Sequence, residues 1–104
     1  MQKKMSDRMH KIVIRPAAKK DIKKIWLYTY KYWGEQQADN YTNSLGEAIN
    51  AIPVNPKIGS SIEHIRKGYR LYHFTHHFVI YRITSTTIDI VRVLGESMAI
   101  KRHL

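Results

Sequence analysis

A single glycine, Gly34, separates two helical patterns, and this short connection constrains the fold more than any other feature of the sequence. In residues 16–33, apolar side chains recur at every third or fourth position, which predicts a helix with one buried stripe. Residues 35–52 repeat the spacing, and Pro53 and Pro56 end this second helix. The two predicted stripes consist of Ala18, Ile22, Ile25, Trp26, Thr29 and Trp33, and of Ala38, Tyr41, Leu45, Ala48, Ile49 and Ile52. So short a connection leaves room only for an antiparallel helical hairpin.

Runs typical of β-strands lie on both sides of the helical hairpin. The run KIVIR, residues 11–15, predicts a first strand, and Pro16 suits the first position of the helix that follows. After the irregular residues 57–68 come YRLYHF, FVIYRI and IDIVRVL, which are separated only by THH and TSTT. Connections of this length join antiparallel strands. We therefore predict an α+β fold, in which an antiparallel two-helix hairpin packs on a small antiparallel β-sheet.

The length and composition predict one folded domain. The chain has 104 residues, of which 43% are hydrophobic, and we assign residues 11–104 to the domain and residues 1–10 to a flexible basic arm. No apolar run approaches the roughly 20 residues of a membrane span, and the opening MQKKMSDRMH lacks the apolar core of a signal peptide. The absence of cysteine fits a reducing compartment. We expect a cytoplasmic protein with no membrane partner.

The charge predicts an anionic partner. Eighteen Lys and Arg against eight Asp and Glu give a formal net charge of +10, which suits a nucleic acid, an acidic protein or an anionic surface. One basic group lies on the first helix and consists of Lys19, Lys20, Lys23 and Lys24. A second group comes from the sheet region and the tail, and consists of Arg66, Lys67, Arg70, Arg82, Arg92, Lys101 and Arg102. Because Arg82 and Arg92 sit inside apolar strands, each must face the open side of the sheet or have a buried partner.

The sequence predicts no catalytic residue, metal site or cofactor. His76 and His77 fall at a hairpin tip with no carboxylate nearby in sequence, so we interpret them, with His73, as solvated histidines rather than metal ligands. No glycine-rich phosphate loop, nucleophile elbow or paired carboxylate motif occurs. Asp89, between Ile88 and Ile90, is expected to face solvent.

Three segments resemble the ParE toxins of bacterial toxin-antitoxin pairs. The segment RPAAKKDIKKIWLYTYKYWGEQQADNYTNSL is similar to the helical hairpin of that family, with its Pro-Ala-Ala start and Trp-Gly hinge. NPKIGSSIEHIRKGYRLYHFTHHFVIYRI resembles the next segment, and IVRVLGESMAIKRHL resembles the ending. The resemblance covers everything after His10 and implies the RelE/ParE-like fold. It also implies a function, because ParE proteins are known as poisons of DNA gyrase, whereas the related RelE proteins are messenger-RNA endonucleases.

Departures from both families bear on the mechanism. RelE-type nucleases carry basic or His residues where this chain has Phe78 and the run Gly95, Glu96 and Ser97. A phenyl ring and a glycine transfer no proton, which disfavours the nuclease. Many ParE proteins have a His and an Asp where this chain has Gly95 and Ala99, which implies weakened toxicity.

The resemblance implies the toxin component of a type II toxin-antitoxin system, of the kind that stabilises plasmids or chromosomes. Such a toxin inhibits DNA gyrase, alone or with its bound DNA, and is neutralised in a hetero-oligomer by a cognate acidic antitoxin. The residues expected to contact gyrase are Arg82, Arg92, Met98, Lys101 and Arg102. The residues expected to anchor the antitoxin are Trp26, Tyr30 and Trp33, and a core role for both tryptophans is the alternative.

Two other functions and one structural question stay open. The first is a ribosome-dependent mRNA endonuclease of RelE type, for which His73, His76 and Tyr81 are the candidate bases. The second is a degenerate toxin that only binds antitoxin. The tail, residues 98–104, belongs either to the gyrase-binding surface or to the core, if Met98 and Ile100 fold back on the sheet.

Overall fold

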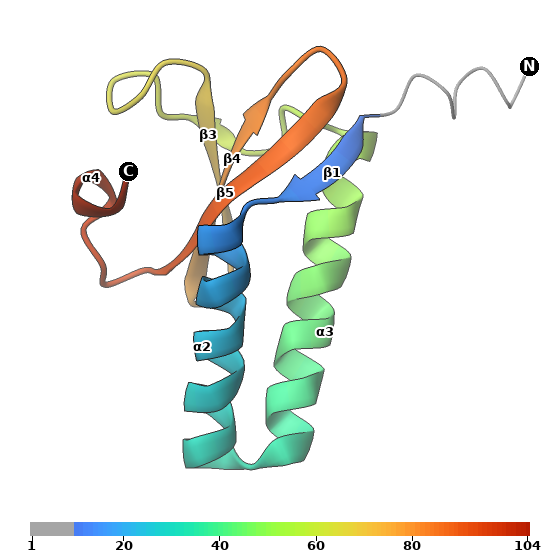
Figure 1. The fold of residues 1–104 in the computed structure, drawn as a ribbon, viewed down its shortest axis with the longest axis vertical. Coiled ribbons are helices and arrows are strands. Elements are labelled where there is room, and N and C mark those ends of the chain that lie inside the picture. The colour runs from blue at the N-terminus through green and yellow to red at the C-terminus, as the bar shows by residue number, and fades with distance from the viewer. Residues whose placement is uncertain (1–9) are drawn as a thin grey trace, which may run out of the picture.

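A computed structural model describes residues 10–104 and confirms the α+β class (Figure 1). The helices are α2 (Pro16–Trp33), α3 (Glu35–Ala51), the 3-10 turn η1 (Ile52–Val54) and α4 (Ile100–His103). The strands are β1 (Lys11–Ile14), β2 (Ser60–Ser61), β3 (Tyr69–Phe74), β4 (His77–Ile83) and β5 (Thr87–Gly95). Apart from His10, the predicted arm of residues 1–10 lies outside the described residues.

The five strands form one sheet in the order β1-β5-β4-β3-β2. As predicted, β3, β4 and β5 are antiparallel neighbours. The sheet is mixed rather than wholly antiparallel, because β1 pairs in parallel with β5, with Ile12 opposite Ile88. In the sequence, the helical hairpin and strands β2, β3 and β4 lie between β1 and β5, and a parallel pair needs a long crossover of this kind. The short strand β2 and helix α4 were not predicted from the sequence.

The helical hairpin forms at the predicted place. Pro16 occupies the start of α2, and Gly34 joins α2 to α3 with a φ of 91°, a conformation that favours glycine. The two helices run side by side, and their tip extends beyond the strands (Figure 1). The end of α2 therefore has no sheet to cover it. This explains why Trp33 is 64% exposed, against our prediction that it belongs to the buried stripe.

Two apolar clusters lie on opposite faces of the sheet. The main core packs the helical hairpin on the sheet and consists of Ala18, Ile25, Leu45, Ile49, Ile52, Val79, Tyr81, Ile88, Ile90 and Val93. On the other face, the second cluster has Ile62, Ile80 and Leu94 at its centre. Its partly buried members are Ile65, Tyr69, Leu71, Phe78, Ile100 and Leu104. This face is therefore partly covered rather than open. None of the helices between residues 10 and 104 has the length and apolar character needed to cross a bilayer.

The Tyr81 hydroxyl ties the irregular segment before β2 to the main core. It donates a hydrogen bond to the carbonyl of Pro56 at 2.6 Å and accepts one from the backbone N–H of Gly59 at 2.9 Å. A Cβ at Gly59 would lie 2.8 Å from both the Leu71 carbonyl oxygen and this hydroxyl, so only glycine fits. One buried tyrosine therefore fixes the path of the chain between α3 and β3.

We predict that Tyr81→Phe lowers the free energy of unfolding by about 1–3 kcal/mol, because it leaves the Gly59 N–H and the Pro56 carbonyl without their partner. Urea unfolding followed by circular dichroism measures the change. Tyr32→Phe, at an exposed site on α2, is the control and should leave stability within about 0.5 kcal/mol of the parent. Equal stability of the two variants would show that the Tyr81 hydroxyl is dispensable.

Candidate functional site

Three aromatic side chains are exposed together near the end of α2. Tyr28, Tyr32 and Trp33 have exposed fractions of 60%, 57% and 64%. Their ring centroids lie 4.8–6.1 Å apart. This aromatic cluster lies on the part of the helical hairpin that extends beyond the sheet. Contiguous exposed apolar side chains mark interaction surfaces, so the aromatic cluster is a candidate docking site.

Trp26 and Tyr30 form a separate pair. Their rings stack at 5.2 Å, and the indole N–H of Trp26 donates to Asp39 Oδ1 of α3 at 2.8 Å. The structure therefore brings two of the three expected antitoxin anchors together. The third, Trp33, belongs to the aromatic cluster.

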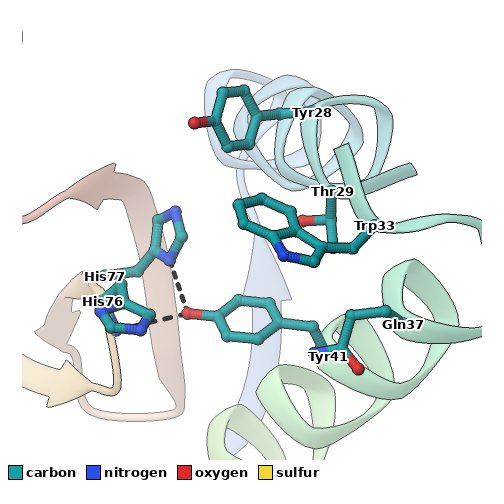
Figure 2. A pocket seen from close by; sticks show the side chains of 7 residues that line it. All are labelled: Tyr28, Thr29, Trp33, Gln37, Tyr41, His76 and His77. Atoms are coloured by element: carbon teal, nitrogen blue, oxygen red, sulfur yellow. Dashed lines mark hydrogen bonds between the residues drawn. The ribbon is translucent and has the colours of Figure 1, made fainter. Parts of the chain in front are cut away.

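A groove runs between the helical hairpin and the tip of the β3–β4 hairpin. Its first part has a volume of about 470 Å³ and is lined by Tyr28, Thr29, Trp33, Gln37, Tyr41, His76 and His77 (Figure 2). A second part, of about 720 Å³, shares four of these residues and continues to Lys24, Arg92 and Met98. We call the two parts together the α2 groove. It connects the aromatic cluster to the start of the tail.

Tyr41 and His77 meet in the wall of the α2 groove. The Tyr41 hydroxyl lies 2.7 Å from His77 Nδ1 and accepts a 3.4 Å hydrogen bond from the His76 backbone N–H. Burial raises the pKa of Tyr41, and burial together with the neighbouring His76 lowers the pKa of His77. Both groups are therefore neutral at pH 7, and the hydroxyl and the imidazole nitrogen share one hydrogen bond. The pair links α3 to the sheet.

A carboxylate lies beside the other two histidines, against our expectation. Glu96 accepts from His73 Nε2 at 2.9 Å and lies 3.4 Å from His76 Nδ1. Hydrogen bonds from His73 and then His76 lower the pKa of Glu96. The residues are distant in sequence, but the pairing of β4 with β5 brings them together, and the Glu96 N–H donates to the His76 carbonyl. Within residues 10–104, no group of three or more potential ligands has a geometry that could hold a metal ion.

Arg92 has a buried partner that we did not identify from the sequence. Asp21 of α2 accepts from Arg92 Nε at 2.7 Å and Nη2 at 2.8 Å, and from the Val93 backbone N–H at 2.9 Å. The hydrogen bonds that Arg92 donates to Asp21 raise the pKa of Arg92. Asp21 carried a sequence signal, because it lies one turn after Ala18 and one turn before Ile25 on the buried stripe.

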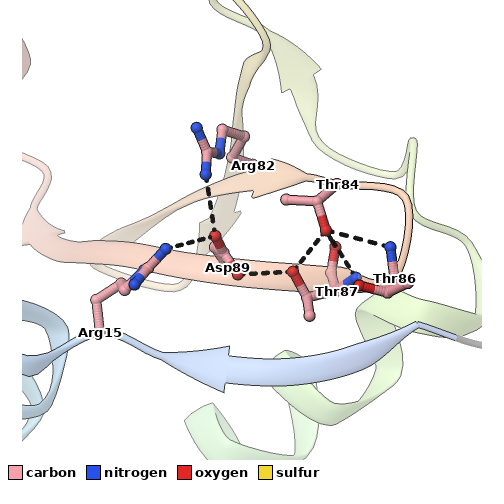
Figure 3. Close-up of polar contacts among 6 residues, drawn as sticks. All are labelled: Arg15, Arg82, Thr84, Thr86, Thr87 and Asp89. Carbon is pink, nitrogen blue, oxygen red and sulfur yellow. Dashed lines mark hydrogen bonds and ion pairs between the residues drawn. The ribbon is translucent and has the colours of Figure 1, made fainter.

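Arg82 also has a buried partner, Asp89 (Figure 3). The Asp89 carboxylate accepts from Thr87 Oγ1 at 2.8 Å, Arg15 Nη2 at 2.9 Å and Arg82 Nη2 at 3.3 Å. Burial works to raise the pKa of Asp89, but the hydrogen bonds from Thr87, Arg15 and Arg82 together hold it below its usual value. Our expectation of a solvent-facing carboxylate was wrong, because two arginines from neighbouring segments cover it.

The tail folds back on the sheet. Ile100 and Leu104 join the second cluster. Two hydrogen bonds hold the tail's backbone, from Arg92 Nη1 to the His103 carbonyl at 3.1 Å and from Arg66 Nη1 to the Leu104 main-chain oxygen at 2.6 Å. The remaining tail residues that we expected to contact gyrase are exposed, and they are Met98, Lys101 and Arg102. The structure therefore groups Arg92 with the tail and leaves Arg82 in a separate cluster.

Phe78 and Gly95, two of the positions that correspond to nuclease residues, carry no proton-transfer group. Phe78 packs in the second cluster, with its ring centroid 4.9 Å from that of His73. Beside Gly95, an added Cβ would contact only Met98 among the described residues. Glu96 is engaged by the two histidines, as described above.

Comparison with known proteins identifies relatives over nearly the whole chain. Residues 12–100 match the family described as "ParE toxin of type II toxin-antitoxin system, parDE". The protein "Toxin ParE1" of Mycobacterium tuberculosis is 41% identical over 93 residues, which cover 88% of this chain and 95% of that protein. "Toxin ParE1" of Caulobacter vibrioides is 38% identical over 87 residues, covering 84% and 90%. A solved structure, "Chromosomal ParDE TA system from P. aeruginosa", has the same fold, with a TM-score of 0.75 at 16% identity over 85% of this chain and 97% of that one.

The depressed pKa of Asp89 predicts a loss of stability in acid. Because the pKa is lower in the folded chain than in the unfolded chain, the stabilisation by Asp89 is fully present above about pH 5 and is lost as the pH falls through the folded-state pKa. Asp89→Asn should lower the free energy of unfolding by about 2 kcal/mol at pH 7, and by progressively less below pH 4. Urea unfolding at several pH values measures the difference. Glu47→Gln, an exposed carboxylate on α3, is the control, and a pH-independent effect of Asp89→Asn would contradict the prediction.

Proposed function

The chain belongs to the ParE toxin family of type II toxin-antitoxin systems, and from this premise we propose that it binds DNA gyrase and blocks replication until a cognate antitoxin neutralises it. The observation that carries the proposal is the match of residues 12–100 to this family. Members of the family are in general gyrase inhibitors rather than enzymes. We therefore propose a binding function for the chain.

Three positions weigh against RNA cleavage. Phe78 is packed in an apolar cluster, and Gly95 has no side chain. Tyr81, one of the candidate bases, is buried with its hydroxyl bonded to Pro56 and Gly59. A general base must reach the proton that it abstracts, and this hydroxyl does not reach the surface.

The exposed side of the tail is the surface that we propose for gyrase. Met98, Lys101 and Arg102 are available there. Arg92 supports them indirectly, because its guanidinium joins the His103 carbonyl to Asp21 of α2. In this proposal Arg92 holds the tail in place, and the exposed residues make the contact.

The α2 groove and the aromatic cluster are the surface that we propose for the antitoxin. The groove is long, it is lined by apolar and polar side chains, and an exposed tryptophan stands at one end. An acidic amphipathic segment suits this surface, because apolar side chains can enter the groove while its charges face a chain with a formal net charge of +10. Met98 lies at the other end of the groove, so a bound antitoxin would also cover part of the proposed gyrase surface.

The gyrase proposal is tested with Lys101→Ala/Arg102→Ala. We expect the wild-type chain to inhibit supercoiling by purified gyrase and to leave ribosome-bound mRNA intact in a translation reaction. The double variant should need at least about tenfold more protein for the same inhibition, because it loses two charged contacts while its melting temperature stays the same. Lys20→Ala/Lys23→Ala, which removes two exposed charges from α2, is the matched control. Cuts in the codon at the ribosomal A site would instead support the endonuclease.

The antitoxin proposal is tested with Trp33→Ala. Loss of this exposed ring should speed dissociation of the purified toxin-antitoxin complex by about tenfold or more, because truncation of an interface anchor acts mainly on the dissociation rate. Leu27→Ala, also on α2 and 50% exposed, is the control and should change the rate less than about twofold. Added salt should slow association of the wild-type pair. Equal dissociation rates for the two variants would remove the aromatic cluster from the interface.

A further inference from the structure

Two arginines on the sheet face opposite the helical hairpin are oriented by one buried carboxylate. Asp89 alternates with Ile88 and Ile90, which face the main core, so its side chain lies on the other face. Strand register places Arg82 of β4 directly opposite Asp89. Arg15 continues the parallel ladder of β1, and its N–H donates to the Ile90 carbonyl at 2.9 Å. Three neighbouring segments of regular backbone therefore fix the positions of these side chains.

Most hydrogen-bond donors of the two guanidinium groups remain available. Within residues 10–104, the side chains of Arg15 and Arg82 bond only to Asp89, each through Nη2. The side chains are 51% and 43% exposed. Among these residues, Arg82 Nε is buried and has no partner at all. A guanidinium has five N–H donors in a planar fork, so each exposed group keeps terminal donors that can bind an anion, although the buried Arg82 Nε is out of a ligand's reach.

The surroundings favour an anionic ligand. Asp89 is the only acidic residue in the five strands, and its charge offsets only one of the two arginines. Lys11 of β1 is exposed. It lies on the same face of the sheet as Asp89, because Val13 pairs with Asp89 and residues two apart on a strand share a face. The pairing with Asp89 also restricts the arginine side chains before any ligand binds, which lowers the entropy cost of binding.

We propose that Arg15 and Arg82 together bind a phosphate of a DNA backbone. Both guanidinium groups bond the same carboxylate oxygen of Asp89, so they lie close enough to offer donors to a single phosphodiester. On the side of Asp89 away from Arg15, the Thr87 hydroxyl donates to Asp89 Oδ1 and so helps to hold the carboxylate between the two arginines (Figure 3). This inference rests on the proposed function only for the source of the DNA, which is the duplex held by gyrase.

The test measures binding of the chain alone to a labelled DNA duplex of about 20 base pairs, by fluorescence anisotropy over a range of salt concentrations. The variant Arg15→Gln/Arg82→Gln/Asp89→Asn removes the pair without leaving a buried carboxylate unpaired, and it lowers the net charge by one. Lys23→Gln lowers the net charge by the same amount on α2, on the opposite face of the sheet. Arg15→Lys/Arg82→Lys keeps both charges and the contact with Asp89 but removes the planar forks. Thermal melting checks that each variant is folded.

We expect the triple variant to bind at least about tenfold more weakly, and the slope of log K against log salt to fall by about 1, since one phosphate contact contributes about 0.9. Lys23→Gln should change affinity less than about twofold. The lysine pair should bind at least about threefold more weakly, and this result decides the matter if the triple variant does not fold.

Equal losses for the triple variant and Lys23→Gln, or full binding by the lysine pair, would overturn the proposal. Binding to phosphatidylserine vesicles that depends on the pair, with no binding to the duplex, would also overturn it. Gyrase is absent from this measurement, so duplex binding that requires the pair supports the proposal whether or not the chain inhibits supercoiling.

Discussion

The ion pair between Arg92 and Asp21 joins the three parts of this molecule. Asp21 accepts both prongs of the guanidinium and the Val93 N–H, so a carboxylate removed from water still has its hydrogen bonds satisfied. The same guanidinium reaches the His103 carbonyl. The helical hairpin, the last strand and the tail therefore depend on one buried contact. β1 pairs with β5 only as far as Ile90, and beyond that point Asp21 accepts the backbone N–H of Val93 in place of a strand partner.

Local sequence patterns predicted the elements well, because each pattern reports on a few consecutive residues. The single glycine between α2 and α3 and the hairpin-length links between β3, β4 and β5 fixed most of the fold. Parallel pairing of β1 with β5, the docking of the tail and the approach of Glu96 to His73 were not predictable in this way. Each depends on residues brought together by strand register, which the sequence alone does not specify.

The candidate site shows the same limit at single residues. Trp33 has the spacing of a core residue but lies where the helical hairpin extends beyond the sheet. Asp89 has the pattern of a solvent-facing residue but is covered by Arg15 and Arg82. For the strand arginines, the sequence correctly limited the choice to an open face or a buried partner, and both have partners. Which acid would pair with each one depended on the tertiary fold.

The parallel contact between β1 and β5 has a consequence for synthesis on the ribosome. Ile12 pairs with Ile88, so the sheet cannot be completed until nearly the whole chain has left the exit tunnel. Until then, the apolar stripes of the nascent helical hairpin lack the strands that bury them, and contacts between such distant residues form slowly. A truncated translation product would therefore lack both the closed sheet and the docked tail. The topology itself delays the appearance of a competent toxin until β5 is free to pair with β1.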